Sequence, residues 1–221
     1  MGCRHFSFDL WLTLIKSNPT FKLRRDEMFH NVFNPKELSL EEVSAIVRKV
    51  DINSNRCCEV THLHVPVERM IYDILQELGV SETECDNYAI EIAKKRIQTL
   101  FMTYPPTLYD DNTVKMLKRL FDSNYTLNIL SNTGFILGST LDLVLANLGI
   151  RKYFQFAIYS DQECIAKPNF FIFEKVVAKA NYPAASIIHV GDNAIADGAC
   201  TKVGIKYFQI NSNTKSIKDL I

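Results

Sequence analysis

The chain has 221 residues, with 25 basic and 25 acidic side chains, and 47% of its positions are hydrophobic. This composition is typical of a globular protein and excludes disorder and collagen-like structure, while the length allows one large domain or a core with a smaller insert. Zero formal net charge argues against a dedicated nucleic-acid-binding protein, which would contact phosphates mainly through Lys and Arg.

The N-terminal apolar segments, at 6–8 and 10–15, are interrupted by polar residues and fall far short of the ~20 residues that span a bilayer. No small-residue cleavage site follows them, so they do not resemble a secretory signal. The six cysteines form no CxxC pair. We therefore expect a cytoplasmic protein with reduced thiols and no membrane partner.

The first predicted element is a buried strand within residues 5–15, an apolar and aromatic-rich stretch that carries one polar residue, Asp9, at the end of the strand. The pattern then becomes helical for almost ninety residues. Ser-x-x-Glu capping boxes at 39–42 and 81–84 mark helix starts. The predicted helices cover 21–33, 39–50, 66–78 and 84–101.

From residue 113 onward, helical and strand-like segments alternate. Helices are predicted over 113–122, 139–148, 169–180 and 195–203, and strands over 126–130, 156–159, 186–190 and 206–210. Such alternation predicts an α/β fold with a doubly wound, mostly parallel sheet. The sequence therefore predicts an α/β core formed by residues 1–16 and 105–221, with an inserted all-helical cap formed by 17–104.

Polar residues follow several of the predicted strands. In open α/β sheets, ligands bind beyond the carboxyl ends of the strands, so these positions are candidates for a site. Taken singly, each has an ordinary interpretation as a turn or helix-cap residue. Their shared location favours a functional site built from Asp9, Ser131, Asn132, Lys167, Asp192, Asn193 and Asp197.

Three carboxylates at one sheet edge repel one another, and a single lysine does not offset their charge, so a hard cation is needed to neutralise the acids. Mg²⁺ binds one or two carboxylates together with water and substrate phosphate oxygens. Ser131 and Lys167 can then hold an anion. Asp9 can serve as a nucleophile that attacks phosphorus to give an aspartyl-phosphate.

The segments 9–13, 130–133, 167–168 and 190–197 resemble, in this order, the four signature motifs of the haloacid dehalogenase superfamily. The helical insert directly after the first motif resembles the cap of subfamily I. The resemblance implies that Asp9 is the covalent nucleophile and a metal ligand. It further implies metal ligation by the Trp11 carbonyl and Asp192, phosphate binding by Ser131, Asn132 and Lys167, and supporting roles for Thr13, Asn193 and Asp197.

Two positions depart from the family pattern. Trp11 replaces the second aspartate that phosphatases of this family usually carry, and Leu12 replaces the usual small residue beside it. Tryptophan cannot transfer a catalytic proton, so the general acid/base is missing from its expected position. Because Gly191 and Asp192 are intact, the motifs favour Mg²⁺-dependent phosphoryl chemistry over dehalogenation.

The expected function is hydrolysis of a small phosphorylated metabolite, by a monomer or a homodimer. Three further functions are compatible with the motifs: a catalytically degenerate protein that binds a phosphorylated ligand, a 2-haloacid dehalogenase and a phosphonatase. The last would need a cap lysine, for which Lys36 and Lys49 are the candidates, although both also suit solvated helix positions.

Overall fold

A parallel sheet forms the centre of the molecule. The computed structural model describes residues 2–210 and 217–220. The five strands lie in the order β5-β4-β1-β6-β7, and each neighbouring pair is parallel. This arrangement confirms the predicted α/β class. The strands are β1 (His5–Phe8), β4 (Thr126–Ser131), β5 (Phe156–Tyr159), β6 (Ile187–Gly191) and β7 (Lys206–Gln209).

Helices cover both faces of the sheet, because its side chains alternate between two apolar clusters. Leu127 and Ile129 of β4 pack in the larger cluster, whereas Leu130 packs in a second cluster with Phe173. The helices of the core are α5 (Thr113–Asp122), α6 (Gly138–Asn147), α7 (Ser160–Glu163) and α8 (Phe170–Ala180), with 3₁₀ turns η1 (Arg151–Tyr153), η2 (Ala184–Ser186), η3 (Gly198–Val203) and η4 (Ile217–Leu220).

The strand order changes direction at β1. The chain passes from β1 to β4 and β5 on one side, and then to β6 and β7 on the other. The carboxyl end of β1 therefore lies at the topological switch point, where open α/β sheets bind their ligands.

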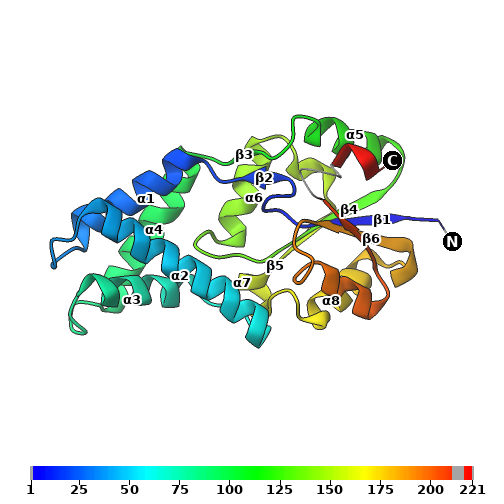
Figure 1. The fold of residues 1–221 in the computed structure, drawn as a ribbon. Helices are drawn as coiled ribbons and strands as arrows, with labels where there is room; N and C mark the ends of the chain where they lie inside the picture. Colours follow the sequence, from blue (N-terminus) through cyan, green and yellow to red (C-terminus); the bar gives the residue numbers. More distant parts are fainter. Residues whose placement is uncertain (1, 211–216, 221) are drawn as a thin grey trace.

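Four helices, which we call the cap helices, lie beyond the carboxyl ends of β1 and its neighbours (Figure 1). They are α1 (Pro19–Val32), α2 (Leu40–Thr61), α3 (Val67–Leu78) and α4 (Asn87–Thr103). A short antiparallel ribbon of β2 (Ile15–Lys16) and β3 (Thr107–Leu108) joins them to the sheet. The division of the chain at 16/17 and 104/105 stays a prediction.

The helix boundaries correct the sequence-based expectation in two places. Helix α2 has the predicted capping box at Ser39 and Glu42, but it continues to Thr61 instead of ending near residue 50. The predicted helix at 84 begins at Asn87 and is capped by Asp86. The serine and glutamate at 81 and 84 instead bind each other within a turn, at 2.6 Å.

The segment 195–203, predicted as a short helix, contains only the 3₁₀ turn η3. Nor does the apolar stretch 5–15 continue as a strand past Phe8. After Asp9 the chain folds back on itself, because the N–H groups of Leu14 and Ile15 both donate to the Leu10 carbonyl. Leu12 adopts the left-handed conformation in this turn, with φ +57°.

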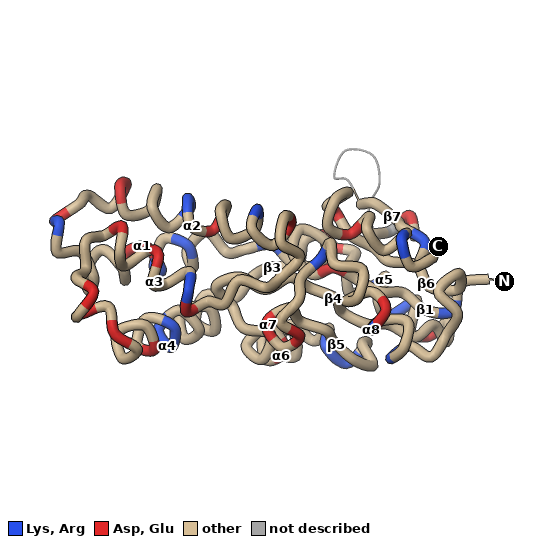
Figure 2. Tube along the Cα trace, turned by 90° about the horizontal axis from the view of Figure 1, so that it is seen from below, with Lys and Arg blue, Asp and Glu red and all other residues tan. Residues whose placement is uncertain are grey.

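Charged residues of both signs are distributed along the whole trace rather than gathered in one block (Figure 2). Within the described part of the chain, no helix is both long enough and apolar enough to cross a membrane.

Candidate active site

Asp9 follows the carboxyl end of β1, at the edge of the sheet that faces the cap helices (Figure 1). Its backbone N–H donates to the Val190 carbonyl at 2.8 Å, so the ladder with β6 extends past the strand and fixes this residue. The side chain is buried, and its Oδ2 accepts a hydrogen bond from Thr13 Oγ1 at 3.1 Å. The carboxyl group of Asp9 is therefore held in one orientation.

Lys167 brings a buried positive charge to Asp9. Its Nζ lies 2.6 Å from Asp9 Oδ1 and 2.5 Å from Asp197 Oδ1. Asn132 holds the lysine backbone in place, because its Oδ1 accepts from the Lys167 N–H and its Nδ2 donates to the Lys167 carbonyl, both at 2.8 Å. Four predicted site residues from separate loops thus meet at one point.

Asp197 is held by donors on both of its oxygens. Besides the lysine, His189 Nε2 lies 3.0 Å from Oδ1, and the Asn193 N–H donates to Oδ2 at 3.0 Å. Burial alone would raise the pKa of Asp197, but the neighbouring ammonium and imidazole groups outweigh burial and hold this pKa below its ordinary value. Asp197 therefore stays a carboxylate.

His189 occupies a polar position inside the sheet. Burial lowers its pKa, so the imidazole is neutral. Its Nε2 faces Asp197, and its Nδ1 lies 3.0 Å from Ser7 Oγ on the adjacent strand. The arrangement assigns the proton to Nε2, because a carboxylate can only accept, and leaves Nδ1 to accept from the serine hydroxyl.

Gly191 allows Asp197 to approach the end of β6. A Cβ at position 191 would lie 2.3 Å from Asp197 Cγ, so a larger residue would push the aspartate out of the site. The next residue, Asp192, adds a third carboxylate. One oxygen from each of Asp9, Asp192 and Asp197 lies within 4.8 Å of the others.

The three carboxylates suit a divalent cation. Burial raises the pKa of Asp9 to about 7 against the opposing charge of Lys167, and burial together with Asp197 raises the pKa of Asp192. One lysine does not neutralise three acids, and hard carboxylate oxygens are the ligands that Mg²⁺ prefers. Asp9 and Asp192 are the residues that would hold the ion.

Trp11 forms a wall of the site rather than a proton-transfer group. Its indole lies edge-to-face with Phe101 of α4, with the ring centres 6.0 Å apart. It lines the same cavity as Asp9. The assignment of the Trp11 backbone carbonyl as a metal ligand stays a prediction.

The two residues predicted to bind phosphate beside Lys167 are placed differently. Asn132 lines the cavity, although its amide group is engaged with the lysine backbone. Ser131 is fully buried, and its Oγ donates to the Asn132 carbonyl at 3.1 Å. The hydroxyl would have to leave that bond to reach a phosphate, so its predicted contact stays a prediction.

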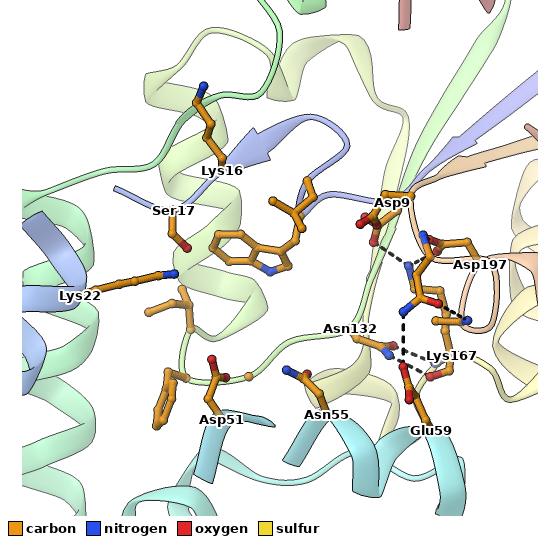
Figure 3. Close-up of a pocket in the computed structure, with 18 of the residues that line it drawn as sticks. Asp9, Lys16, Ser17, Lys22, Asp51, Asn55, Glu59, Asn132, Lys167 and Asp197 are labelled. Carbon is orange, nitrogen blue, oxygen red and sulfur yellow. Dashed lines mark hydrogen bonds and ion pairs between the residues drawn. The ribbon is translucent and has the colours of Figure 1, made fainter. Parts of the chain in front are cut away.

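A cavity of about 500 Å³ connects these residues with the cap helices. Figure 3 shows Asp9, Lys167 and Asp197 on one side, and Asp51, Asn55 and Glu59 projecting into the cavity from α2. This size suits a small ligand enclosed between core and cap.

The sequence motifs did not single out several residues of the site. The one available signal for His189 is that a histidine lies within an apolar strand, directly before the motif 190–197. Glu59 and Asp51 gave no signal, because a carboxylate on a helix is usually solvated. His64 does not line this cavity, and its Nδ1 lies 3.0 Å from Ser160 Oγ.

Comparison with known proteins identifies the family. Residues 7–210 match the family model described as haloacid dehalogenase-like hydrolase. The chain belongs to this hydrolase family. It is 30% identical over 97 residues to haloacid dehalogenase-like hydrolase domain-containing protein 3 of Danio rerio, and 29% identical over 75 residues to the protein of that name in Xenopus laevis.

These matches cover 41% and 34% of this chain, and 40% and 31% of the zebrafish and frog relatives. The alignments therefore span well under half of each relative. The matches support membership of the family, but the names of the relatives do not state a substrate.

Solved structures of this hydrolase family share the fold. The HAD-hydrolase YfnB from Bacillus subtilis, bound to magnesium, has a TM-score of 0.73 and 16% identity, with 97% of this chain and 92% of that chain covered. A HAD phosphatase from Thermococcus onnurineus has a TM-score of 0.70 and 19% identity, with 97% of this chain and 88% of that chain covered. A 2-haloacid dehalogenase from Pseudomonas syringae has a TM-score of 0.65 and 18% identity, with 97% of this chain and 89% of that chain covered. At these identities the likeness concerns the fold alone.

Proposed function

We propose that this hydrolase is a Mg²⁺-dependent phosphatase that acts on a small phosphorylated compound through an aspartyl-phosphate on Asp9. The observation that carries the proposal is the position of Lys167 between Asp9 and Asp197, with Asp192 completing a group of three carboxylates. Phosphoryl transfer needs a nucleophile and positive charge that stabilises the phosphoryl oxygens, and these residues can supply both.

Phosphoryl transfer would proceed in two steps. In the first, an Asp9 oxygen attacks phosphorus, and the bond from phosphorus to the leaving oxygen breaks. In the second, water attacks the same phosphorus, the bond to Asp9 breaks, and inorganic phosphate leaves. Lys167 would stabilise negative charge on the phosphoryl oxygens. Mg²⁺ held by Asp9 and Asp192 would supply further positive charge.

Trp11 supports a second candidate, a degenerate member that binds a phosphorylated ligand without hydrolysing it. A positioned acid/base typically contributes ~10²–10⁴-fold to the rate, and position 11 cannot supply one. We favour the enzyme because the nucleophile, the lysine and the three carboxylates are all present. Aryl and acyl phosphates, which release weakly basic leaving groups, would be its best substrates.

Dehalogenase and phosphonatase activities fit the site less well. A dehalogenase has no use for the cluster of Asp9, Asp192 and Asp197, which is suited to a cation. The two lysines considered for a phosphonatase do not supply the amine that it needs, because Lys36 Nζ donates to the Glu77 carbonyl at 3.0 Å and Lys49 Nζ to Glu77 Oε2 at 2.9 Å. The cap lysine that does line the cavity is Lys22 of α1. The described cysteines are all free, which supports a reducing compartment such as the cytoplasm.

Product analysis tests the proposal. The protein is incubated with p-nitrophenyl phosphate, acetyl phosphate or 2-chloropropionate, in Mg²⁺ or in chelator. We expect phosphate release from the two phosphates in Mg²⁺ and none in chelator. Halide release that persists in chelator would support a dehalogenase instead, and the absence of any product would support the degenerate ligand-binding protein.

A further inference from the structure

We propose that Glu59, on the cap helix α2, is the general base that activates water in the second step. This inference rests on the proposed function. It assigns a residue to the proton transfer that position 11 cannot perform, because Trp11 lies where the resemblance to the family's phosphatases implies an acidic group.

The direction of attack requires a base on the cap side. Asp9 approaches phosphorus from the end of β1, so in-line displacement places the leaving group on the opposite side. The attacking water later enters from that same side. The cavity opposite Asp9 is lined by α1 and α2, which belong to the cap helices. A base for this water must therefore project from the cap helices or from position 11.

Two carboxylates of the cap helices line the described part of this cavity, and they lie at different ends (Figure 3). Asp51 lies near Lys22 and Arg25, whose charges oppose the effect of burial on its pKa. Glu59 projects toward the end that holds Lys167 and Asp197. Glu59 is therefore better placed than Asp51 to reach the reacting phosphoryl group.

Glu59 is tied directly to the core. Its Oε1 accepts a hydrogen bond from Asn193 Nδ2 at 3.3 Å. Asn193 follows Asp192, and its own Oδ1 accepts from the N–H groups of Ile195 and Ala196 at 2.9 and 3.0 Å. The asparagine is thus rigid, and it leaves the second oxygen of Glu59 free of any hydrogen bond among the described residues.

The end of α2 is also anchored beside Lys167. The His62 carbonyl accepts from the Ala166 N–H and from Asn169 Nδ2, both at 3.2 Å. Leu63 forms an isolated bridge with Ile165. Glu59 lies one turn before His62, so these contacts hold it at a fixed position relative to the lysine, as a catalytic group requires.

Glu59 activates the attacking water in the second step. After the leaving group has departed, the Glu59 carboxylate accepts a proton from water while the water oxygen bonds to phosphorus. The bond from phosphorus to Asp9 breaks, and its electron pair returns to the Asp9 carboxylate. Glu59 then loses its proton to solvent.

The test is pre-steady-state kinetics of p-nitrophenyl phosphate with Mg²⁺, comparing the wild-type protein with Glu59→Gln. The amide can still accept from Asn193, so the cap contact is kept while the base is lost. We expect a burst of about one phenolate per active site, followed by turnover reduced ~10²-fold or more. Acid-quenched variant protein should carry a phosphoryl group that neutral hydroxylamine removes. Glu41→Gln, which changes an exposed carboxylate of the same helix that does not line the cavity, should give no burst.

The outcomes separate the two claims. Wild-type turnover together with a Glu59→Gln variant that shows linear kinetics and no phosphoryl-protein would overturn the role of Glu59 and leave the phosphatase standing. A wild-type protein that releases no phenolate would overturn both. Glu59→Ala guards against a folding defect, since added formate should restore its turnover if a missing carboxylate is the cause. A folded Glu59→Ala without rescue would contradict the proposal.

Discussion

The ammonium group of Lys167 lies 2.6 Å from Oδ1 of Asp9, although 158 positions separate the two residues in the chain. Both side chains are almost fully buried. A buried ion pair stabilises a fold only weakly, because desolvation cancels most of its Coulombic attraction. The position of this ion pair at the carboxyl end of the central strand is therefore better explained by a role in catalysis than by a contribution to the stability of the fold.

The free energy of unfolding of Asp9→Asn tests the electrostatics of the site. Burial raises the pKa of Asp9 to about 7, above its value in the unfolded chain. Between about pH 4 and pH 7 the unfolded chain loses this proton while the folded protein keeps it, so the contribution of Asp9 to stability falls as pH rises. In chelator, the free energy of unfolding of Asp9→Asn, relative to that of the wild-type protein, should therefore rise by on the order of 3 kcal/mol as the pH is raised from 5 to 8.

Urea unfolding at both pH values measures this gain. Asp122→Asn is the control, because that side chain is 55% exposed on α5 and should show no comparable dependence. An Asp9→Asn protein that is less stable than the wild-type protein at pH 8 would show that the attraction to Lys167 outweighs burial.

Mg²⁺ should raise the melting temperature of the wild-type protein. A ligand that binds only the folded state stabilises it by about 2.7 kcal/mol at a hundred times its dissociation constant. Asp192→Asn should lose most of this gain, whereas Asp51→Asn should keep it, because Asp51 lies outside the three-carboxylate cluster. Equal gains in the wild-type protein and Asp192→Asn would remove Asp192 from the metal site.

Replacing Trp11 by aspartate should widen the substrate range. Without a positioned acid, an alkoxide leaving group must depart unprotonated, so alkyl phosphates should be turned over far more slowly than aryl phosphates. We expect Trp11→Asp to narrow this difference in kcat/KM. Trp11→Asn, which also removes the indole but carries no acid, is the control. A wild-type protein that already prefers alkyl phosphates would show that an acid lies elsewhere.

Leu12 is expected to destabilise the turn that follows Asp9. It adopts φ +57°, which is unfavourable for a residue with a side chain, and its side chain is half exposed. Leu12→Gly should therefore be more stable than Leu12→Ala by about 1 kcal/mol, since both lose the same packing and only glycine relieves the backbone. The two midpoints in urea measure the difference. A more stable alanine variant would contradict this explanation.

The sequence was sufficient to predict the parallel sheet and the residues at its carboxyl edge, because strand periodicity and strand-end polar residues are local features. Lys167 and Asp9 could be placed together because parallel strands end at one edge. The turn after Asp9 was not predicted, because position 12, which has a positive φ, is a leucine and not the glycine or asparagine that usually marks such a turn.

The contribution of the cap helices could not be read from the sequence. Glu59 meets Asn193 across 134 positions, and nothing in the periodicity of α2 distinguishes it from a solvated glutamate. His189 likewise has a role only because β1 lies beside β6 and supplies Ser7. Both depend on packing between elements rather than on local pattern.

The most direct test of the central claim, that Asp9 is the nucleophile, is steady-state phosphate release from p-nitrophenyl phosphate in saturating Mg²⁺ by the wild-type protein and by folded Asp9→Asn. We predict turnover by the wild-type protein, and a variant that retains less than a few per cent of it while keeping the native circular dichroism spectrum. A folded Asp9→Asn protein that releases phosphate at a rate close to that of the wild-type protein would contradict the assignment of Asp9.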